Sequence, residues 1–375
     1  MDSQRTNLAS ADLPGTDTWQ EVLGEVSPEH QFLSHHWYDV WGRTYAANDG
    51  EMSPMVFSTP AAQTGPLEEK NSIFPCISRS RYGIQILSMA GYYYPFRTFL
   101  FHPDVKDRAI ERFAKSVHEQ GSASIVNLGP IQMSDGLGVA LRHSFGQLRW
   151  HVCEVSAGAQ QVIELPDSIE KFRASLSRNL RRNHDRRKRA LESMGQLDIA
   201  HYSSCSAEQW NQVVDQCSSI EARSWLASDD NGKTRIYGRE DFWKSYLAAE
   251  DGSRRMSISL VSLDSNPIAY SLAIDSGSCR YSISGQYDEA YKKYGVGIIA
   301  DMQMFVNAIE NGFKVVNMGD GEGEYKQRWG AQPGSELQSF YLFRAGISGW
   351  FMYKLFRTLN QLRDSTLLHK LNRYF

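Results

Sequence analysis

Strand-like and turn-like segments alternate between residues 255 and 318 in an order that few folds can accommodate. Apolar, β-branched runs cover 255–263, 268–275 and 279–286. Short turns rich in Asp, Ser, Asn and Gly separate them, so the pattern predicts an antiparallel meander. The turn Gly295–Val296–Gly297 follows and opens an apolar-periodic helix, which Gly312 ends before Val315–Met318 returns as a strand. The series predicts a sheet whose third strand leads through a glycine turn and a helix to a further strand.

The glycine turn has the properties of an anion site. Glycines let the backbone approach a ligand closely, and the first N–H groups of a helix, together with its positive dipole end, favour a phosphate. Lys292 and Lys293 precede the turn and add positive charge. The turn can equally be an ordinary strand-to-helix connection, because short glycine motifs occur in many contexts.

Composition limits the classes of protein. A chain of 375 residues is long enough for two or three domains, and a net charge of -3 argues against a general nucleic-acid coat. The five cysteines are widely spaced, which favours reduced thiols over disulfides and indicates no metal site. The polar residues 1–17 are expected to be a disordered leader and not a signal peptide. Without an apolar run long enough for a membrane span, the expectation is a soluble, cytoplasmic protein.

The chain is expected to have two α/β units followed by a tail. Ser34 caps a short helix near the start; strands are predicted at 71–78, 82–89, 96–101 and 124–128, with a helix before the last of them. Residues 54–70 are predicted to be an extended loop. A loose stretch at 156–168 marks the junction, and one long helix is predicted from Asp167 to Gly195. The expected units are 18–158 and 159–345, with the tail at 346–375.

Several fragments, in this order, resemble one family. They are Phe32–Leu33–Ser34–His35–His36–Trp37, Ile163–Glu164–Leu165–Pro166, Ser175–Leu176–Ser177–Arg178–Asn179–Leu180–Arg181–Arg182, Tyr287–Asp288–Glu289–Ala290–Tyr291, Gly295–Val296–Gly297 and Gly319–Asp320–Gly321–Glu322–Gly323–Glu324–Tyr325–Lys326–Gln327–Arg328–Trp329. Together they resemble the GNAT acetyltransferase superfamily, in particular its sixth domain group of CelD-like proteins linked to cellulose and polysaccharide biosynthesis. That group is similar in build to the Fem-type peptidoglycan-bridge aminoacyltransferases.

The resemblance implies an α/β (α+β) fold of two tandem GNAT-like domains, each with a mixed, mostly antiparallel sheet flanked by helices. It also implies that acyl-CoA, acetyl-CoA in particular, is the donor, bound by Lys292, Lys293, Gly295, Val296 and Gly297, without a metal. The family signature carries Arg or Gln three residues before the first glycine, whereas this chain has Lys292.

The segment after Val315–Met318 carries the candidate catalytic residues. It follows the carboxyl end of a strand, where open α/β sheets tend to bind ligands. Lys326 matches the lysine of the Fem-type motif, which implies contact with the donor or with developing negative charge. Tyr325 can donate a proton to a leaving group, and Asp320 or Glu324 can act as base. The alternative is a glycine-rich turn with solvated charges.

A basic stretch precedes these residues. Seven of the twelve positions from Arg178 to Arg189 are basic, and Arg178, Arg181 and Arg182 are candidates for binding an anionic substrate, which includes tRNA. A solvated helix face is the alternative. Trp225 and Tyr287 are candidates for the acceptor groove, although Trp225 can also be a core residue.

The tail alternates apolar and basic residues at helical spacing. It is expected either to contact a membrane surface or to dock on its own domain. Altogether the sequence predicts an N- or O-acyltransferase that acts on an amine or hydroxyl of a sugar or cell-envelope precursor. An aminoacyl-tRNA-dependent transferase and a non-catalytic assembly module in polysaccharide biosynthesis are the alternatives.

Overall fold

The computed structural model describes residues 15–45, 51–52, 55–60, 69–91, 97–121, 123–134, 136–228, 236–321 and 323–364. Within these residues a continuous eleven-stranded sheet runs through the molecule in the order β1-β4-β5-β7-β14-β8-β13-β12-β11-β10-β9. Most strand pairs are antiparallel, and helices flank the sheet, which confirms the predicted α/β fold class. The fold is nevertheless built on one shared sheet and not on two separate ones.

The N-terminal lobe contains the first strands of the sheet. These are β1 (Glu51–Met52), β4 (Cys76–Arg81), β5 (Ile84–Met89) and β7 (Ile125–Gln132), beside a small sheet of β2 (Met55–Pro60), β3 (Glu69–Phe74) and β6 (Leu100–Phe101). Helices α3 (Lys106–Gln120), which follows the 3-10 turn η3 (Pro103–Val105), and α4 (Leu137–Gln147) cover the lobe, and Phe113 and Phe145 belong to its apolar core.

The C-terminal lobe contains the predicted meander. It consists of β9 (Leu197–Ser203), β10 (Met256–Leu263), β11 (Asn266–Ser276), β12 (Cys279–Tyr287) and β13 (Val315–Asp320). Strands β10, β11 and β12 pair antiparallel, and β13 pairs parallel to β12, as the sequence predicts. One side of this sheet packs on α7 (Ala207–Glu221), α8 (Glu240–Leu247) and α9 (Glu250–Arg255); the other side packs on α5 (Ile169–Ser175), α6 (Arg178–Glu192) and α10 (Val296–Glu310).

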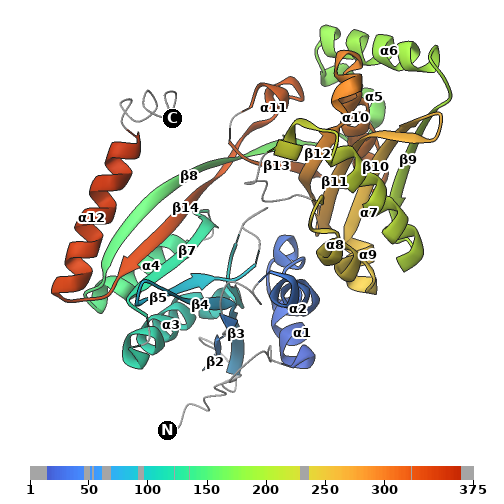
Figure 1. Cartoon of the computed structure of the whole chain (residues 1–375). Coiled ribbons are helices and arrows are strands. Elements are labelled where there is room, and N and C mark those ends of the chain that lie inside the picture. The colour runs from blue at the N-terminus through green and yellow to red at the C-terminus, as the bar shows by residue number, and fades with distance from the viewer. Residues whose placement is uncertain are drawn as a thin grey trace.

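Two long strands join the lobes. β8 (His151–Glu164) pairs with β14 (Gln332–Phe343) along most of its length and with β13 near its end, and β14 also pairs with β7 (Figure 1). The loose stretch expected at 156–159 therefore lies inside a continuous strand, and the sheet has no break between 158 and 159. Small residues fit there because backbone pairing with β14 fixes the segment, so composition alone misassigned it.

The first helices bring the two lobes together. α1 (Thr16–Glu25) contacts the small sheet, and α2 (His35–Thr44) contacts α8 of the C-terminal lobe, with η1 (Pro28–His30) between them. The Ser34 cap is confirmed, since its hydroxyl accepts a hydrogen bond from the Trp37 N–H at 3.2 Å. The expected leader 1–17 lies outside the described residues up to 14, and α1 already begins at Thr16.

Three further predictions are wrong in detail. The strand predicted at 71–78 divides at Pro75 into β3 and β4, which belong to different sheets, since proline cannot donate a ladder hydrogen bond. Part of the loop predicted at 54–70 is strand β2, and 61–68 lie outside the described residues. The single helix expected at 167–195 is two helices, because Leu176 is extended and Ser177 caps α6 through the Leu180 N–H.

Candidate active site

The glycine turn opens a helix, as predicted. After β12, the Asp288 side chain accepts a hydrogen bond from the Ala290 N–H and starts the 3-10 turn η5 (Glu289–Tyr294). Gly295 has a left-handed conformation, φ 56°, and caps α10. The first hydrogen bond of the helix runs from the Ile298 N–H to the Gly295 carbonyl, and the first turn contains no acidic residue. The N–H groups at the helix start therefore remain available to an anion.

The Arg187 guanidinium of α6 lies directly over this turn. A Cβ built on Gly295 would come within 2.5 Å of Arg187 Nη1, so a side chain at this position would displace the guanidinium. Burial lowers the pKa of Arg187, and the nearby charges of Arg186 and Arg328 lower it further. No carboxylate pairs with Arg187 among the described residues. A phosphate would supply the missing counter-charge.

The two lysines at the turn have other contacts. The exposed Lys292 pairs with Glu289 at 3.0 Å, and Lys293 Nζ lies 4.9 Å from the centre of the Tyr294 ring. The interior of the turn instead faces Tyr287 at the end of β12, whose ring a Cβ on Gly297 would approach to 3.3 Å. Arg187, which the sequence places only within the basic stretch, is thus a cation that lies against the turn.

The predicted substrate-binding arginines lie at the start of α6. Arg178 and Arg182 are exposed, Arg181 is half-buried, and none of the three forms an ion pair within the described part of the chain. Positive charge near a helix N-terminus opposes the helix dipole. α6 packs against α10 and η5, so this unbalanced charge lies on the same side of the lobe as the glycine turn.

Lys326 is bound to the end of β13. It is buried in the short helix α11 (Glu324–Arg328), and its ammonium donates to the carbonyls of Gly319, Asp320 and Gly321 at 3.4, 2.5 and 3.0 Å. Burial lowers its pKa. With its three protons directed at backbone oxygens, Lys326 holds the strand end in shape and places a positive charge beside it.

The neighbouring candidates differ in exposure. The Tyr325 ring is 52% exposed, and burial of its hydroxyl end, with the charges of Asp301 and Asp320, raises the pKa of the phenol to about 12, so that it stays protonated near neutral pH. Asp320 ends β13 beside Lys326. Glu324 is exposed and pairs with Arg328 at 3.5 Å, so its carboxylate lies at the surface.

Asp301 is the site residue that sequence reasoning missed. It lies on α10 and faces β12, where its Oδ1 would be 3.6 Å from a Cβ on Gly285. Burial raises the pKa of this carboxyl to about 6, although the polar groups of Ser271 and Trp329 oppose the shift. An acidic residue inside an otherwise apolar helix stripe was the signal available in the sequence. The charge of Asp301 also helps to raise the pKa of Tyr325.

The strands open at this end of the sheet. β12 and β13 pair only from Cys279–Val315 to Tyr281–Asn317 and then separate, while both strands continue to Tyr287 and Asp320. Tyr287, Tyr325 and Lys326 thus stand at the same end of the lobe. Trp225 is 56% exposed and starts the 3-10 turn η4 (Trp225–Ser228). This turn lies near the end of β12, because the Glu289 N–H donates to the carbonyl of Arg223, two residues before Trp225.

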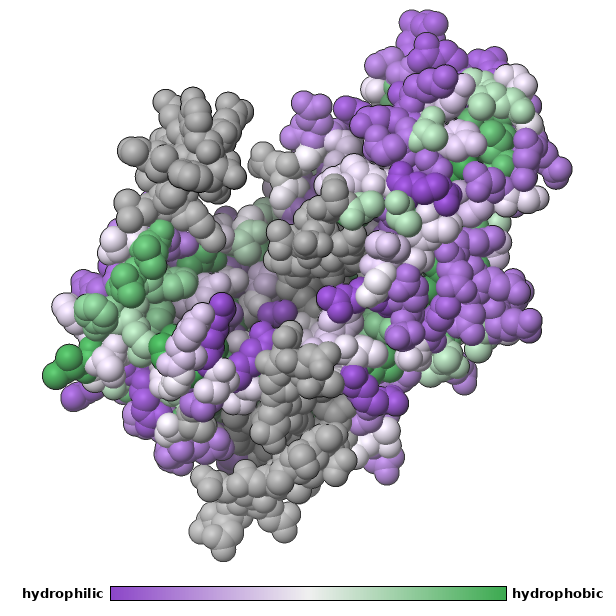
Figure 2. Space-filling model, viewed as in Figure 1, coloured by the Kyte–Doolittle hydropathy of each residue, from purple (hydrophilic) through white to green (hydrophobic). Residues whose placement is uncertain are grey.

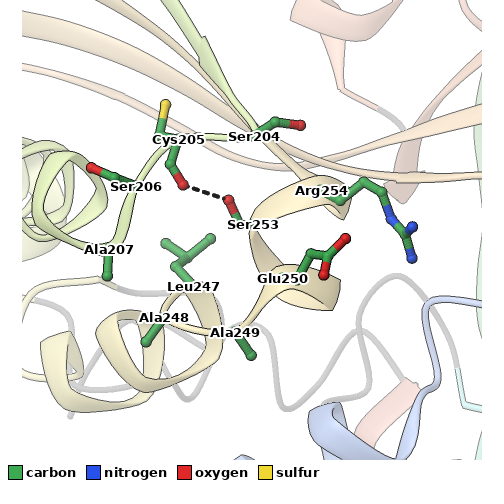
Figure 3. A pocket seen from close by; sticks show the side chains of 10 residues that line it. All are labelled: Ser204, Cys205, Ser206, Ala207, Leu247, Ala248, Ala249, Glu250, Ser253 and Arg254. Carbon is green, nitrogen blue, oxygen red and sulfur yellow. Dashed lines mark hydrogen bonds between the residues drawn. The ribbon is translucent and has the colours of Figure 1, made fainter.

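A pocket of about 400 Å³ lies elsewhere. Figure 3 shows its lining from Ser204 to Ala207 and from Leu247 to Arg254. It follows the end of β9, and the antiparallel register puts that end opposite to the end where β12 meets the glycine turn. The Ser253 hydroxyl donates to the Cys205 carbonyl and accepts from the Trp210 indole N–H, so polar groups at its wall serve packing.

Among the described residues, no group of three or more His, Cys, Asp or Glu side chains is arranged to hold a metal ion. None of the described helices has the length and apolar character needed to cross a membrane.

Comparison with known proteins gives one family match and several similar folds. Residues 178–327 match the family model described as acetyltransferase (GNAT) domain. Among solved structures, FemX is similar with a TM-score of 0.59 at 12% identity, covering 92% of this chain and 98% of its own. L-PGS from Bacillus licheniformis gives 0.51 at 10% identity, covering 93% and 98%. A conserved protein of unknown function from Bacteroides thetaiotaomicron gives 0.53 at 9% identity, covering 88% and 96%.

No curated protein matches the chain in sequence. At such low identity the structural similarities establish the fold alone, while the family match covers the segment from α6 to α11 that contains the glycine turn and Lys326. Residues 178–327 are therefore similar to the acetyltransferase (GNAT) domain family, and the overall fold of the chain is similar to that of FemX.

Proposed function

We propose that the C-terminal lobe transfers an acyl group, acetyl in particular, from acyl-CoA to an amine or hydroxyl of a sugar or cell-envelope polysaccharide precursor. The observation that carries the proposal is the start of α10: Gly295 and Gly297 keep Cβ atoms away, the first turn has no carboxylate, and Arg187 lies over it with no acidic partner in the described part of the chain. This combination suits the phosphates of a donor. The class of acceptor rests on the sequence resemblance.

The reaction needs a held donor, a base and a proton source. With the donor phosphates at Gly295–Gly297 and its thioester between the separating ends of β12 and β13, the acceptor nitrogen or oxygen attacks the thioester carbonyl. Asp301 takes the acceptor proton, because its pKa of about 6 leaves it ionised near neutral pH while keeping it a stronger base than an ordinary carboxylate. The C–S bond breaks, and the departing sulfur takes a proton from Tyr325.

Lys326 has a supporting role in this scheme. It is bound to the Gly319–Gly321 carbonyls and fixes the end of β13, and its charge stabilises negative charge that develops nearby. Direct transfer is expected, since the sequence has no nucleophile elbow or Cys-His motif.

The alternative donor is an aminoacyl-tRNA. Arg178, Arg181 and Arg182, which form no ion pair within the described residues, favour it because they extend the positive surface beyond what one CoA molecule requires. The overall similarity to FemX agrees with this second candidate. A non-catalytic assembly module that keeps the fold is the third.

Donor titrations at several salt concentrations distinguish the three. CoA thioester binding is expected to raise the melting temperature and to weaken only modestly with salt, whereas tRNA binding through many phosphates falls steeply. Gly297→Asp must abolish the response if the turn is the donor site. A melting temperature raised by charged tRNA alone would identify the Fem-type donor. A melting temperature that neither ligand raises would favour the non-catalytic assembly module.

A further inference from the structure

Helix α12 (Ile347–Asp364) is held on the N-terminal lobe by one face. It contacts β8 and β14. The Phe356 ring lies 4.4 Å from that of Tyr341 and 5.6 Å from that of Phe343, and Tyr353 stacks on His151 at 5.6 Å. These centroid distances are those of packed aromatic pairs, so the orientation of α12 is fixed by its own lobe.

The opposite face of α12 is apolar and exposed. Ile347, Phe351, Leu355 and Leu359 follow one another at four-residue spacing, which aligns them on one side of a helix. Their exposed fractions are 89%, 62%, 50% and 56%, and Trp350 beside them is also exposed. Figure 2 shows apolar residues gathered over this helix at the left of the view. Such a continuous patch marks an interaction surface.

The charge of this segment is opposite to that of the chain. Residues 346–375 contain Lys354, Arg357, Arg363, Lys370 and Arg373 and one acidic residue, Asp364, which gives a net charge of +4 in a chain of net -3. Lys354 and Arg357 are exposed, and Lys354 Nζ lies 5.7 Å from the centre of the Trp350 ring. A partner that covers the apolar face therefore meets a basic border.

We propose that α12 lies in the interface of an anionic lipid bilayer, with Ile347, Phe351, Leu355 and Leu359 among the acyl chains and the basic side chains at the headgroups. A protein partner would satisfy the apolar face, but a bilayer of anionic lipids satisfies both the apolar stripe and the basic border along the whole length of the helix. No helix of the described residues can cross a membrane, so this attachment is peripheral. It is independent of the proposed acyl transfer.

Sedimentation of the full-length protein with vesicles tests the proposal. Binding is expected with phosphatidylglycerol mixed into phosphatidylcholine and to be about tenfold or more weaker with phosphatidylcholine alone, as each basic residue near an anionic surface contributes about 1 kcal/mol. The variant Phe351→Glu/Leu355→Glu should abolish binding to either vesicle. Lys354→Glu/Arg357→Glu should remove the preference for anionic lipid.

Matched controls change other surfaces. Tyr82→Glu alters an aromatic residue that is 92% exposed at the β4–β5 turn, and Lys115→Glu/Lys171→Glu reverses two exposed lysines; both should bind like the unchanged chain. Absence of vesicle binding by the unchanged protein overturns the proposal. So does a dimer in analytical ultracentrifugation that Phe351→Glu/Leu355→Glu dissociates, since the face would then bind a second copy. Neither outcome bears on the donor titrations.

Discussion

The two lobes contain the same strand–helix–strand unit, and the proposed anion site lies in the C-terminal one. In the N-terminal lobe β5 leads through α3 to the parallel strand β7, and in the C-terminal lobe β12 leads through α10 to β13. Each strand pair is aligned over three residue pairs, and each helix has 15 residues. Topology is therefore not what makes the C-terminal lobe a candidate enzyme.

The units differ first at their strand ends. In the N-terminal lobe the Arg97 guanidinium donates to the carbonyls of Gly91 and Gly129, and the Gly129 N–H contacts Met89 Sδ, so protein groups link β5 to β7. In the C-terminal lobe Lys326 binds the end of β13 alone. The first arrangement fills the space between the strands, whereas the second leaves the end of β12 separate.

The helices differ at two matching positions. The second residue is Asp107 in α3 and Gly297 in α10. The sixth is Glu111 in α3, exposed and paired with Lys115 at 2.6 Å, and Asp301 in α10. The Lys115 contact lowers the pKa of Glu111, while burial raises that of Asp301 to about 6. In the proposed function these two positions separate α3 from α10, where Gly297 lies at the donor site and Asp301 is the base.

The largest effect is expected for Asp301→Asn. Loss of a general base lowers kcat about 100- to 10,000-fold, and Glu111→Gln, the matched change in α3, should leave kcat unchanged. In the unchanged enzyme, kcat/KM should rise with pH through about 6, because Asp301 must be ionised. A pH profile without that rise, or equal activity of both variants, would remove Asp301 from the mechanism.

The same variant has a testable effect on stability. The folded-state pKa of Asp301 is raised above the usual 3.8, so the folded protein binds more protons than the unfolded chain, and this group's contribution to stability falls as pH rises from about 4 to about 6. Asp301→Asn should therefore gain about 2 kcal/mol relative to the unchanged protein at pH 7 compared with pH 4. Urea denaturation at the two pH values measures this difference.

Gly297→Asp ranks next, since it gives α10 the residue that α3 carries. A carboxylate at the helix start repels the donor phosphates, and donor affinity should fall about 30- to 100-fold, the loss of charge-assisted hydrogen bonds worth about 2–3 kcal/mol. The reciprocal change Asp107→Gly should not alter affinity. Calorimetric titration with CoA measures both, and unchanged affinity of Gly297→Asp would place the donor elsewhere.

Replacing Lys326 or Arg97, the cations at the two strand ends, has a smaller expected effect. It distinguishes a loss of stability from a loss of donor affinity. Lys326→Met and Arg97→Met each leave buried carbonyls without a donor and should lower the free energy of unfolding by about 1–3 kcal/mol. Only Lys326→Met should also weaken donor binding. Chemical denaturation and the same titration decide it, and an equal loss of affinity in both variants would mean that the lobes are coupled through the shared sheet.

The smallest effect is expected for Lys292→Gln. Its ammonium is exposed and paired with Glu289, and such a pair contributes about 0–1 kcal/mol. Donor affinity should change about twofold or less, while Arg187→Gln, which removes the guanidinium over Gly295, should cost about tenfold. A larger effect from Lys292 would show that it turns toward the donor.

Much of the C-terminal lobe could be predicted because its signals are local. The meander, the glycine turn and the helix that follows are encoded by turn residues and by periods of two and 3.6 residues. Prediction was weaker where long-range pairing decides, as in β8, whose small residues form a strand because β14 lies beside them. The break before α6 was hidden by an apolar stripe that continues through it, although Ser177 is a recognisable cap.

For the site, residue type identified the segments of the chain that form it, and contacts in the structure identified the single residues. The glycine turn and the segment around Lys326 were recognisable as sequence motifs. Arg187 and Asp301 belong to no motif and gain their properties from burial and from neighbours distant in the chain, such as Gly295 for the first and Ser271 and Trp329 for the second.

The sequence alone determined the order of strands and helices in the C-terminal lobe and the presence of a glycine-opened helix, because backbone conformational preferences act between near neighbours. Only the tertiary structure decided that one sheet spans both lobes, that Lys326 binds backbone carbonyls and that the Asp301 carboxylate faces β12. Electrostatic environment and strand pairing depend on groups that folding brings together, and the distances between these groups cannot be read from their order in the sequence.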